Sequence, residues 1–207
     1  MKKIILITVA IGSLFFTANM QGQELKVKEY GIGFYGFNSY SLQYRWGNEN
    51  RLYRLNGNID SQTQFGNTQA NSNKPTVDLG GGLGFSILKL KEINEKFGIF
   101  HGASFGINYD FNLIKHTSNE ISYINKNQSL RPNIGITIGA FYKITPSIIL
   151  YAEITPNIYY SYNFSKNSQT DVLSNQTEIN KVHSNAIGLS SFSNSSALLT
   201  LAYRITK

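Results

Sequence analysis

The hydrophobic residues of this chain alternate one for one with polar residues over most of its length. Between Tyr40 and Trp46, aromatic and aliphatic side chains alternate with Ser41, Gln43 and Arg45. A period of two places successive side chains on opposite faces, as in a β-strand. We therefore predict eight strands and, apart from a turn near residues 91–95, no helix beyond the N-terminal segment. The predicted strands span residues 27–36, 39–46, 51–60, 76–89, 97–112, 131–143, 147–164 and 186–205.

The two faces of these strands differ in chemistry. One face carries large apolar side chains such as Leu55, Ile107 and Ile136, and the other carries glycines, amides, hydroxyls and charges. No stretch after residue 23 holds 18 consecutive apolar residues, so only strands could cross a membrane. The predicted fold is all-β: an eight-stranded antiparallel up-and-down transmembrane β-barrel, apolar outside and polar inside.

The connections between predicted strands fall into two classes, short turns and long polar segments. Outer-membrane barrels have an even number of strands, short periplasmic turns and long extracellular loops. We therefore expect the short connections and both ends of the strand set to be periplasmic. The short connections are residues 47–50, 91–96 and 144–147, and the long ones are residues 61–75, 113–130 and 165–185.

A second count of eight strands is also open. It treats residues 27–46 as one long strand and splits residues 186–205 at residues 193–196. The long loops would then lie on the periplasmic side. We prefer the first count because it keeps these loops outside the cell.

Charged residues on the inner face predict ion pairs. The interior of an eight-stranded barrel is only wide enough for side chains to fill it, and a buried charge without a partner is very costly. We predict that Glu153 lies inside the barrel and bonds to one or more of Arg45, Arg54 and Arg204.

Aromatic residues cluster at the ends of the predicted strands. Membrane barrels carry aromatic girdles at both interfaces. A water-soluble barrel such as a lipocalin shares the same period and stays open as an alternative. The predicted interface aromatics are Tyr44, Trp46, Tyr142 and Tyr203 near the short turns, and Tyr160 and Tyr162 near the long loops.

The N-terminal segment has the composition of a secretory signal peptide. A basic start, an apolar run over residues 4–16 and a polar exit with small residues are typical of such signals. We predict cleavage between Ala18 and Gly22, and assign residues 1–22 to the signal peptide and 23–207 to the barrel domain. The expected location is the cell outer membrane.

Charge and cysteine content exclude several kinds of site. The net charge of +7 falls to +5 if Lys2 and Lys3 are lost with the signal, and the remaining lysines are scattered, so we expect no nucleic-acid partner. No cysteine is present, which excludes disulfides and thiolate metal sites. His101, His116 and His183 lack metal-ligand spacing, so we expect no metal and no cofactor.

The segment RPNIGITIGAFYKITPSIILYAEI and the closing LLTLAYRI carry a family resemblance. Together with the signal and the eight strands, they resemble the small outer-membrane barrels of the OmpX/OmpA-like superfamily. They are particularly similar to the outer membrane protein beta-barrel domain proteins of Bacteroidetes-type bacteria. The resemblance covers the whole mature chain but includes no invariant motif. It implies insertion by the outer-membrane assembly machinery, although this chain lacks the usual terminal aromatic residue.

Two motifs suggest other chemistry. Gly31–Gly36 matches the dinucleotide pattern G-x-G-x-x-G, but a strand rather than a helix follows it, so we interpret these as barrel-strand glycines. The segment around His183 and Ser184 resembles that of outer-membrane lipid A deacylases, in which histidine and serine lie two residues apart on one face. Here the two residues are adjacent and point to opposite faces unless a β-bulge intervenes.

The predicted function is therefore a non-enzymatic integral outer-membrane protein with a structural or surface-interaction role. The alternatives are a deacylase-like hydrolase using His183 and Ser184, or a narrow pore. Expected partners are outer-membrane lipid and lipopolysaccharide, and a monomer is favoured. The residues expected to reach lipopolysaccharide phosphates are Lys74, Lys115, Lys126, Lys166 and Lys181.

Overall fold

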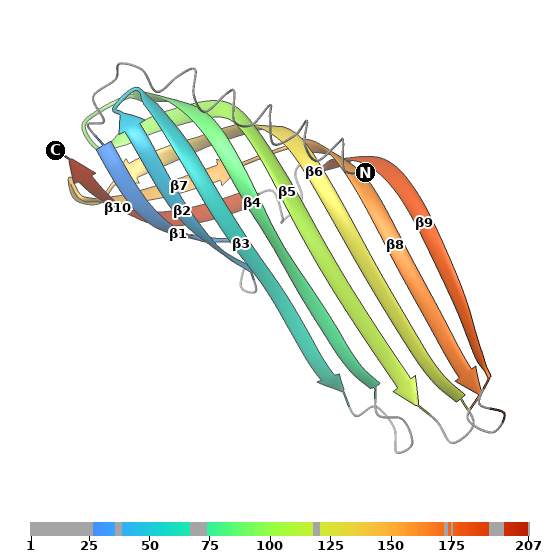
Figure 1. Cartoon of the computed structure of the whole chain (residues 1–207). Helices are drawn as coiled ribbons and strands as arrows, with labels where there is room; N and C mark the ends of the chain where they lie inside the picture. Colours follow the sequence, from blue (N-terminus) through green and yellow to red (C-terminus); the bar gives the residue numbers. More distant parts are fainter. Residues whose placement is uncertain are drawn as a thin grey trace.

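The protein folds into ten antiparallel β-strands in one continuous sheet that closes on itself (Figure 1). No helix in the described part of the chain is long and apolar enough to span a membrane. The predicted signal peptide, residues 1–22, lies outside the described residues. The structure, a computed structural model, describes residues 27–35, 39–66, 74–117, 121–171, 174, 176–190 and 197–206.

The ten strands are named in chain order. They are β1 (Val27–Phe34), β2 (Ser39–Asn48), β3 (Arg51–Gly66), β4 (Lys74–Glu92), β5 (Phe97–Thr117), β6 (Ile121–Lys143), β7 (Ile148–Ile154), β8 (Asn157–Asp171), β9 (Thr177–Ser190) and β10 (Ala197–Thr206).

These ten strands follow eight paths around the barrel. β7 and β8 both run antiparallel to β6 and lie end to end along it, interrupted at Thr155 and Pro156. Proline has no N–H for a ladder, although the carbonyl of Pro156 still accepts a bond from the Ile136 amide at 3.1 Å. β9 and β10 likewise run in one direction along β8 and β7. The ladder between β10 and β1 closes the ring, which confirms the predicted eight-stranded antiparallel barrel.

The pairing of β1 with β2 distinguishes the two predicted topologies. β1 and β2 are separate antiparallel strands, paired from Val27 with Gly47 to Phe34 with Tyr40. The second count, which joined residues 27–46 into one strand, is therefore wrong. Its proposed break at residues 193–196 lies outside the described residues, but β9 and β10 run in the same direction and form no hairpin with each other.

One end of the barrel, here the turn end, carries three hairpin turns and the outer ends of β1 and β10. Each turn is closed by one side-chain oxygen that accepts two backbone N–H groups, from Asn48, Asn94 and Thr145 in turn. Gly47 has a φ of 147°, and a β-carbon there would overlap the carbonyl oxygen of Arg51. Short polar side chains and one glycine thus set these turns locally.

At the opposite end, β3, β4, β5, β6, β8 and β9 continue beyond the short β1–β2 hairpin (Figure 1). We call the part of β3, β4, β5, β6, β8 and β9 beyond the Ser39–Asp60 pair the extension. The predicted long loops are wrong in extent, because most of residues 113–130 and 165–185 belongs to two long hairpins, β5–β6 and β8–β9. Both faces of these hairpins are rich in Asn, Ser and Lys, so the apolar alternation that marks a half-buried strand is weak there.

The interior of the ring near the turn end is apolar. Side chains from seven strands fill the base of the barrel, with Leu52 and Ile149 fully buried. The cluster contains Val27, Leu52, Leu88, Leu90, Phe100, Phe141, Ile149, Tyr151 and Ala202.

Candidate functional site

Above the apolar base, the charged residues of the interior lie in one row across neighbouring strands. The pairing register places Arg204 opposite Glu29, Glu29 opposite Arg45, and Arg45 opposite Arg54. Two like charges directly opposite each other are unfavourable. Arg45 and Arg54 can be neighbours because each pairs with its own carboxylate.

Glu29 is the centre of the first ion-pair group and is completely buried. Its carboxylate lies 2.7 Å from a guanidinium nitrogen of Arg204 and 3.4 Å from one of Arg45. The hydroxyl of Tyr151 donates to the same carboxylate at 2.8 Å, and the Arg45 guanidinium lies 3.8 Å from the centre of the Tyr151 ring. Two cations and one phenol therefore depend on a single carboxylate.

Arg54 and Glu153 form the second ion-pair group. One guanidinium nitrogen of Arg54 lies 2.5 and 2.6 Å from the two carboxylate oxygens of Glu153. The other donates to Ser86 at 3.0 Å. From Ser86, a chain of hydroxyl contacts continues around the wall through Ser104, Thr137 and Thr155. This chain joins three further strand paths, those of β4, β5 and β6, to the ion pair.

A cavity of about 670 Å³ lies above the second ion-pair group. Arg54 and Ser86 form its base, and Tyr35, Tyr159 and a set of asparagines line its wall. Arg131 donates to Asp110 at its rim, where both side chains are partly exposed. Among the described residues, no group of three or more acidic, histidine or cysteine side chains gathers to hold a metal ion.

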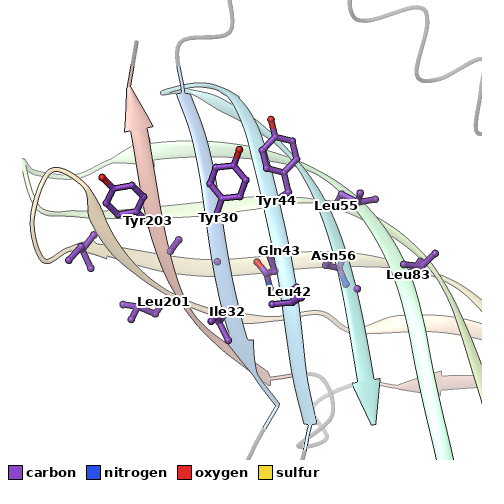
Figure 2. Close-up of a pocket in the computed structure, with 14 residues that line it drawn as sticks. Tyr30, Ile32, Leu42, Gln43, Tyr44, Leu55, Asn56, Leu83, Leu201 and Tyr203 are labelled. Atoms are coloured by element: carbon purple, nitrogen blue, oxygen red, sulfur yellow. The ribbon is translucent and has the colours of Figure 1, made fainter.

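The outer face of the ring is apolar, as Figure 2 shows for β10, β1, β2, β3 and β4. Tyr203, Tyr30 and Tyr44 are cross-strand neighbours and form one level, and Leu201, Ile32 and Leu42 form the next. These side chains surround a groove of about 720 Å³, in which Gly57 provides no side chain between Leu42 and Leu83. Large apolar residues are highly exposed here, with Leu42 at 68% and Leu83 at 65%.

The predicted interface aromatics lie on this outer face at two levels. Near the turn end, Trp46 stacks between Tyr44 and Tyr53 with ring centres 5.3 and 5.9 Å away. Tyr203 and Tyr142 are exposed on other strands. Towards the extension, Tyr160 is exposed and Tyr162 contacts the ring of His183 on β9.

Further along the extension than the upper aromatics, Tyr160 and Tyr162, three lysines form a row on the same outer face. Lys126, Lys166 and Lys181 are direct cross-strand neighbours on β6, β8 and β9, and we call them the lysine row. Lys115 lies on β5 opposite Ile124, close to this row. Among the described residues, none of these four lysines forms an ion pair. The side chain of Lys74 lies outside the described residues.

His183 and Ser184 do not come together. The β8–β9 register is unbroken from Asn157–Ser190 to Thr170–Thr177, so no bulge separates the two residues. Nδ1 of His183 lies 3.0 Å from the hydroxyl of Tyr162, and its ring packs on Phe164. Strand alternation places Ser184 on the opposite face.

Sequence reasoning selected Glu153 and its arginines but missed Glu29 and Tyr151. The structure brings Glu153 to Arg54 only, and gives Arg45 and Arg204 to Glu29. The alternation in β1 could have identified Glu29 as an interior residue, because Glu29 shares the inner face with Gly31 and Gly33.

Two proteins of known structure are similar to this chain. No family model and no curated protein matches it. A major outer membrane protein from Thermus thermophilus is 15% identical, with a TM-score of 0.49, over 87% of this chain and 98% of that one. CarO from Acinetobacter baumannii is 11% identical, with a TM-score of 0.38, over 90% of this chain and all of that one.

Proposed function

We propose that this protein is an integral outer-membrane barrel with a structural and surface-interaction role. The observation that carries the proposal is the inversion of the two faces: ion pairs are buried inside the ring, and large apolar side chains are exposed outside it. On β6 the outward apolar positions run from Leu130 to Tyr142, at least the roughly 9–11 residues that a tilted strand needs to span a bilayer. Hydrocarbon tails are the solvent that suits such a face.

In this proposal the turn end is periplasmic and the extension is extracellular. Short turns on one side and long hairpins on the other match the asymmetry of outer-membrane barrels. We also retain the expectation of a monomer inserted by the outer-membrane assembly machinery.

The filled interior argues against transport through the barrel. An apolar cluster and two ion-pair groups occupy the lumen on the turn-end side of the cavity. A non-enzymatic role is further supported by the separation of His183 from Ser184. Planar-bilayer currents at the nanosiemens level would contradict the closed interior.

Membrane insertion is tested by extraction and migration. We expect the protein to require detergent for extraction and to migrate faster in SDS gels before boiling than after it, because folded barrels resist SDS. A monodisperse protein that remains soluble without detergent would contradict the proposal.

The surface role that we propose is contact with lipopolysaccharide. The lysine row sits beyond the upper aromatics, where phosphate groups of the outer leaflet would lie. These three ammonium groups have no carboxylate partner among the described residues, and they repel one another because they lie in direct register. Bound phosphates would relieve that repulsion.

This contact is tested by removing the charges. The triple variant Lys126→Gln, Lys166→Gln, Lys181→Gln should retain several-fold less lipopolysaccharide after detergent extraction, measured as bound phosphate per folded barrel. The matched control is Lys28→Gln, Lys89→Gln, Lys96→Gln, which removes the same charge at the turn end. Equal retention by the two triple variants would contradict the contact.

A further inference from the structure

The wall of the cavity has a regular construction in which asparagines face glycines across neighbouring strands. Asn56 lies opposite Gly84, Asn58 and Asn108 lie opposite Gly82, and Asn133 lies opposite Gly106. Glycine is the only residue that leaves the backbone bare at these positions. Each amide therefore has room beside its neighbouring strand, and the lumen stays open.

The spacing confirms how closely these amides lie on the glycines. A β-carbon added at Gly82 would overlap Oδ1 of Asn108 and lie 2.6 Å from Oδ1 of Asn58. One added at Gly84 would lie 2.5 Å from Oδ1 of Asn56. The amides thus occupy the space that a side chain at these glycines would fill.

These four amides have unused hydrogen-bonding capacity. None of the Asn56, Asn58, Asn108 and Asn133 side chains has a hydrogen-bond partner among the residues that the structure describes. Each amide offers two donors and one acceptor. A concave wall with several amides at fixed positions suits a ligand that carries many groups able both to donate and to accept.

Among the described residues that line the cavity, the charged side chains of Arg54, Asp110 and Arg131 are all paired. Arg54 is paired with Glu153 below the cavity, and Arg131 with Asp110 at the rim. A charged ligand would therefore have to compete with an existing ion pair. The site favours a neutral ligand.

The cavity also offers an aromatic surface and a suitable size. Tyr159 lines it, and its ring lies against Gly188 of β9, where an added β-carbon would overlap the ring. Aromatic rings pack against the apolar faces of sugar rings while amides bond the hydroxyls. A volume of about 670 Å³ lies within the roughly 300–1,000 Å³ of small-molecule sites.

We propose that this cavity binds a neutral saccharide through the amides of Asn56, Asn58, Asn108 and Asn133. The inference does not rest on the lysine row or on membrane insertion, because the cavity lies inside the ring. It assigns a ligand to the interior, whereas the proposed surface role concerns the outer face.

The test uses the folded protein in a detergent without a sugar headgroup. Lactose, maltose and N,N′-diacetylchitobiose are titrated by calorimetry, and a glycan array adds the ends of longer neutral and acidic chains. We expect at least one neutral sugar to bind, and acidic analogues to bind more weakly. The absence of binding by any neutral glycan, with the SDS-resistant folded form intact, would overturn the proposal.

Two variants locate the binding in the cavity. Asn58→Leu with Asn108→Leu keeps the number and branching of side-chain heavy atoms but removes two amides, and should weaken binding at least about 10-fold. Gly82→Ala should weaken it similarly, because its methyl group displaces the same two amides. Gly57→Ala is the matched control, since its added β-carbon points outward and meets nothing closer than 3.6 Å. Equal binding by Gly82→Ala and Gly57→Ala would overturn the assignment.

Discussion

The ion pairs inside the closed ring and the ion pair at the rim of the cavity differ in how far they are exposed to solvent. In the ring, the side chains of Arg54 and Glu153 are 4% and 2% exposed, and they link strands 99 positions apart in the sequence. At the rim, the side chains of Arg131 and Asp110 are 40% and 37% exposed and link adjacent strands 21 positions apart. The Arg54–Glu153 pair joins distant walls of the ring. The exposed pair, like the Glu29 pairs with Arg45 and Arg204, links strands that a backbone ladder already joins.

The same contrast continues along the strands. Inside the ring, Glu29 receives bonds from β2, β7 and β10. In the extension, Ser165 donates to Asn127, its direct cross-strand neighbour. The ring therefore adds side-chain bonds across its interior to its backbone ladders, whereas the extension has backbone hydrogen bonds and side-chain contacts between neighbouring strands.

The largest effect is expected from Glu29→Ala. This change leaves both Arg45 and Arg204 buried without a carboxylate, and removing one partner of a buried pair typically costs about 3–5 kcal/mol. Urea unfolding of the detergent-folded barrel should show a loss at least this large. Glu29→Gln keeps an acceptor for Tyr151 and should lose less. If Glu29→Ala unfolded at the same urea midpoint as the wild type, the ring would not need this carboxylate.

A somewhat smaller effect is expected from Glu153→Leu, which leaves a single arginine unpaired. The double variant Arg54→Met, Glu153→Leu should recover most of the lost stability, because replacing a whole buried pair with apolar residues is often neutral. The measurement is a double-mutant cycle from urea unfolding. Additive losses in the double variant would indicate that the two residues act separately.

The smallest effect is expected from Asp110→Asn at the rim. A half-exposed ion pair contributes at most about 1 kcal/mol and is screened by salt. The unfolding midpoint should therefore shift little, and the shift should shrink further as NaCl is raised. A loss comparable to that of Glu29→Ala would remove the distinction between ring and rim.

The fold was predictable because alternation in the ring strands is strong. Leu42 and Tyr44 face outward while Gln43 and Arg45 face inward. Because the side chains alternate with a period of two, the apolar set can occupy only one face of the strand. The extension was not predictable in the same way. Residues 122–129 of β6 carry amides and hydroxyls on both faces, and Lys126 on one of them. Their composition therefore resembles that of a loop, although their backbone ladders continue.

The sequence predicts which charged residues of the site face the interior, but not which of them pair with each other. Inner-face parity selects Glu153 and Arg54, but which carboxylate meets which arginine depends on the stagger of strands around the ring. Glu29 stands directly opposite both Arg45 and Arg204, and only the closed register brings Tyr151 to it from β7. Local sequence contains no information about that encounter.

The ladder between β1 and β10 is the seam of the barrel. All other ladders join paths that follow each other along the chain, whereas this one joins Val27–Phe34 to Leu199–Thr206. Glu29 and Arg204 face each other across it. The last strand of the barrel in chain order must therefore meet the first, and a buried ion pair fastens the two ends of the sheet where they join.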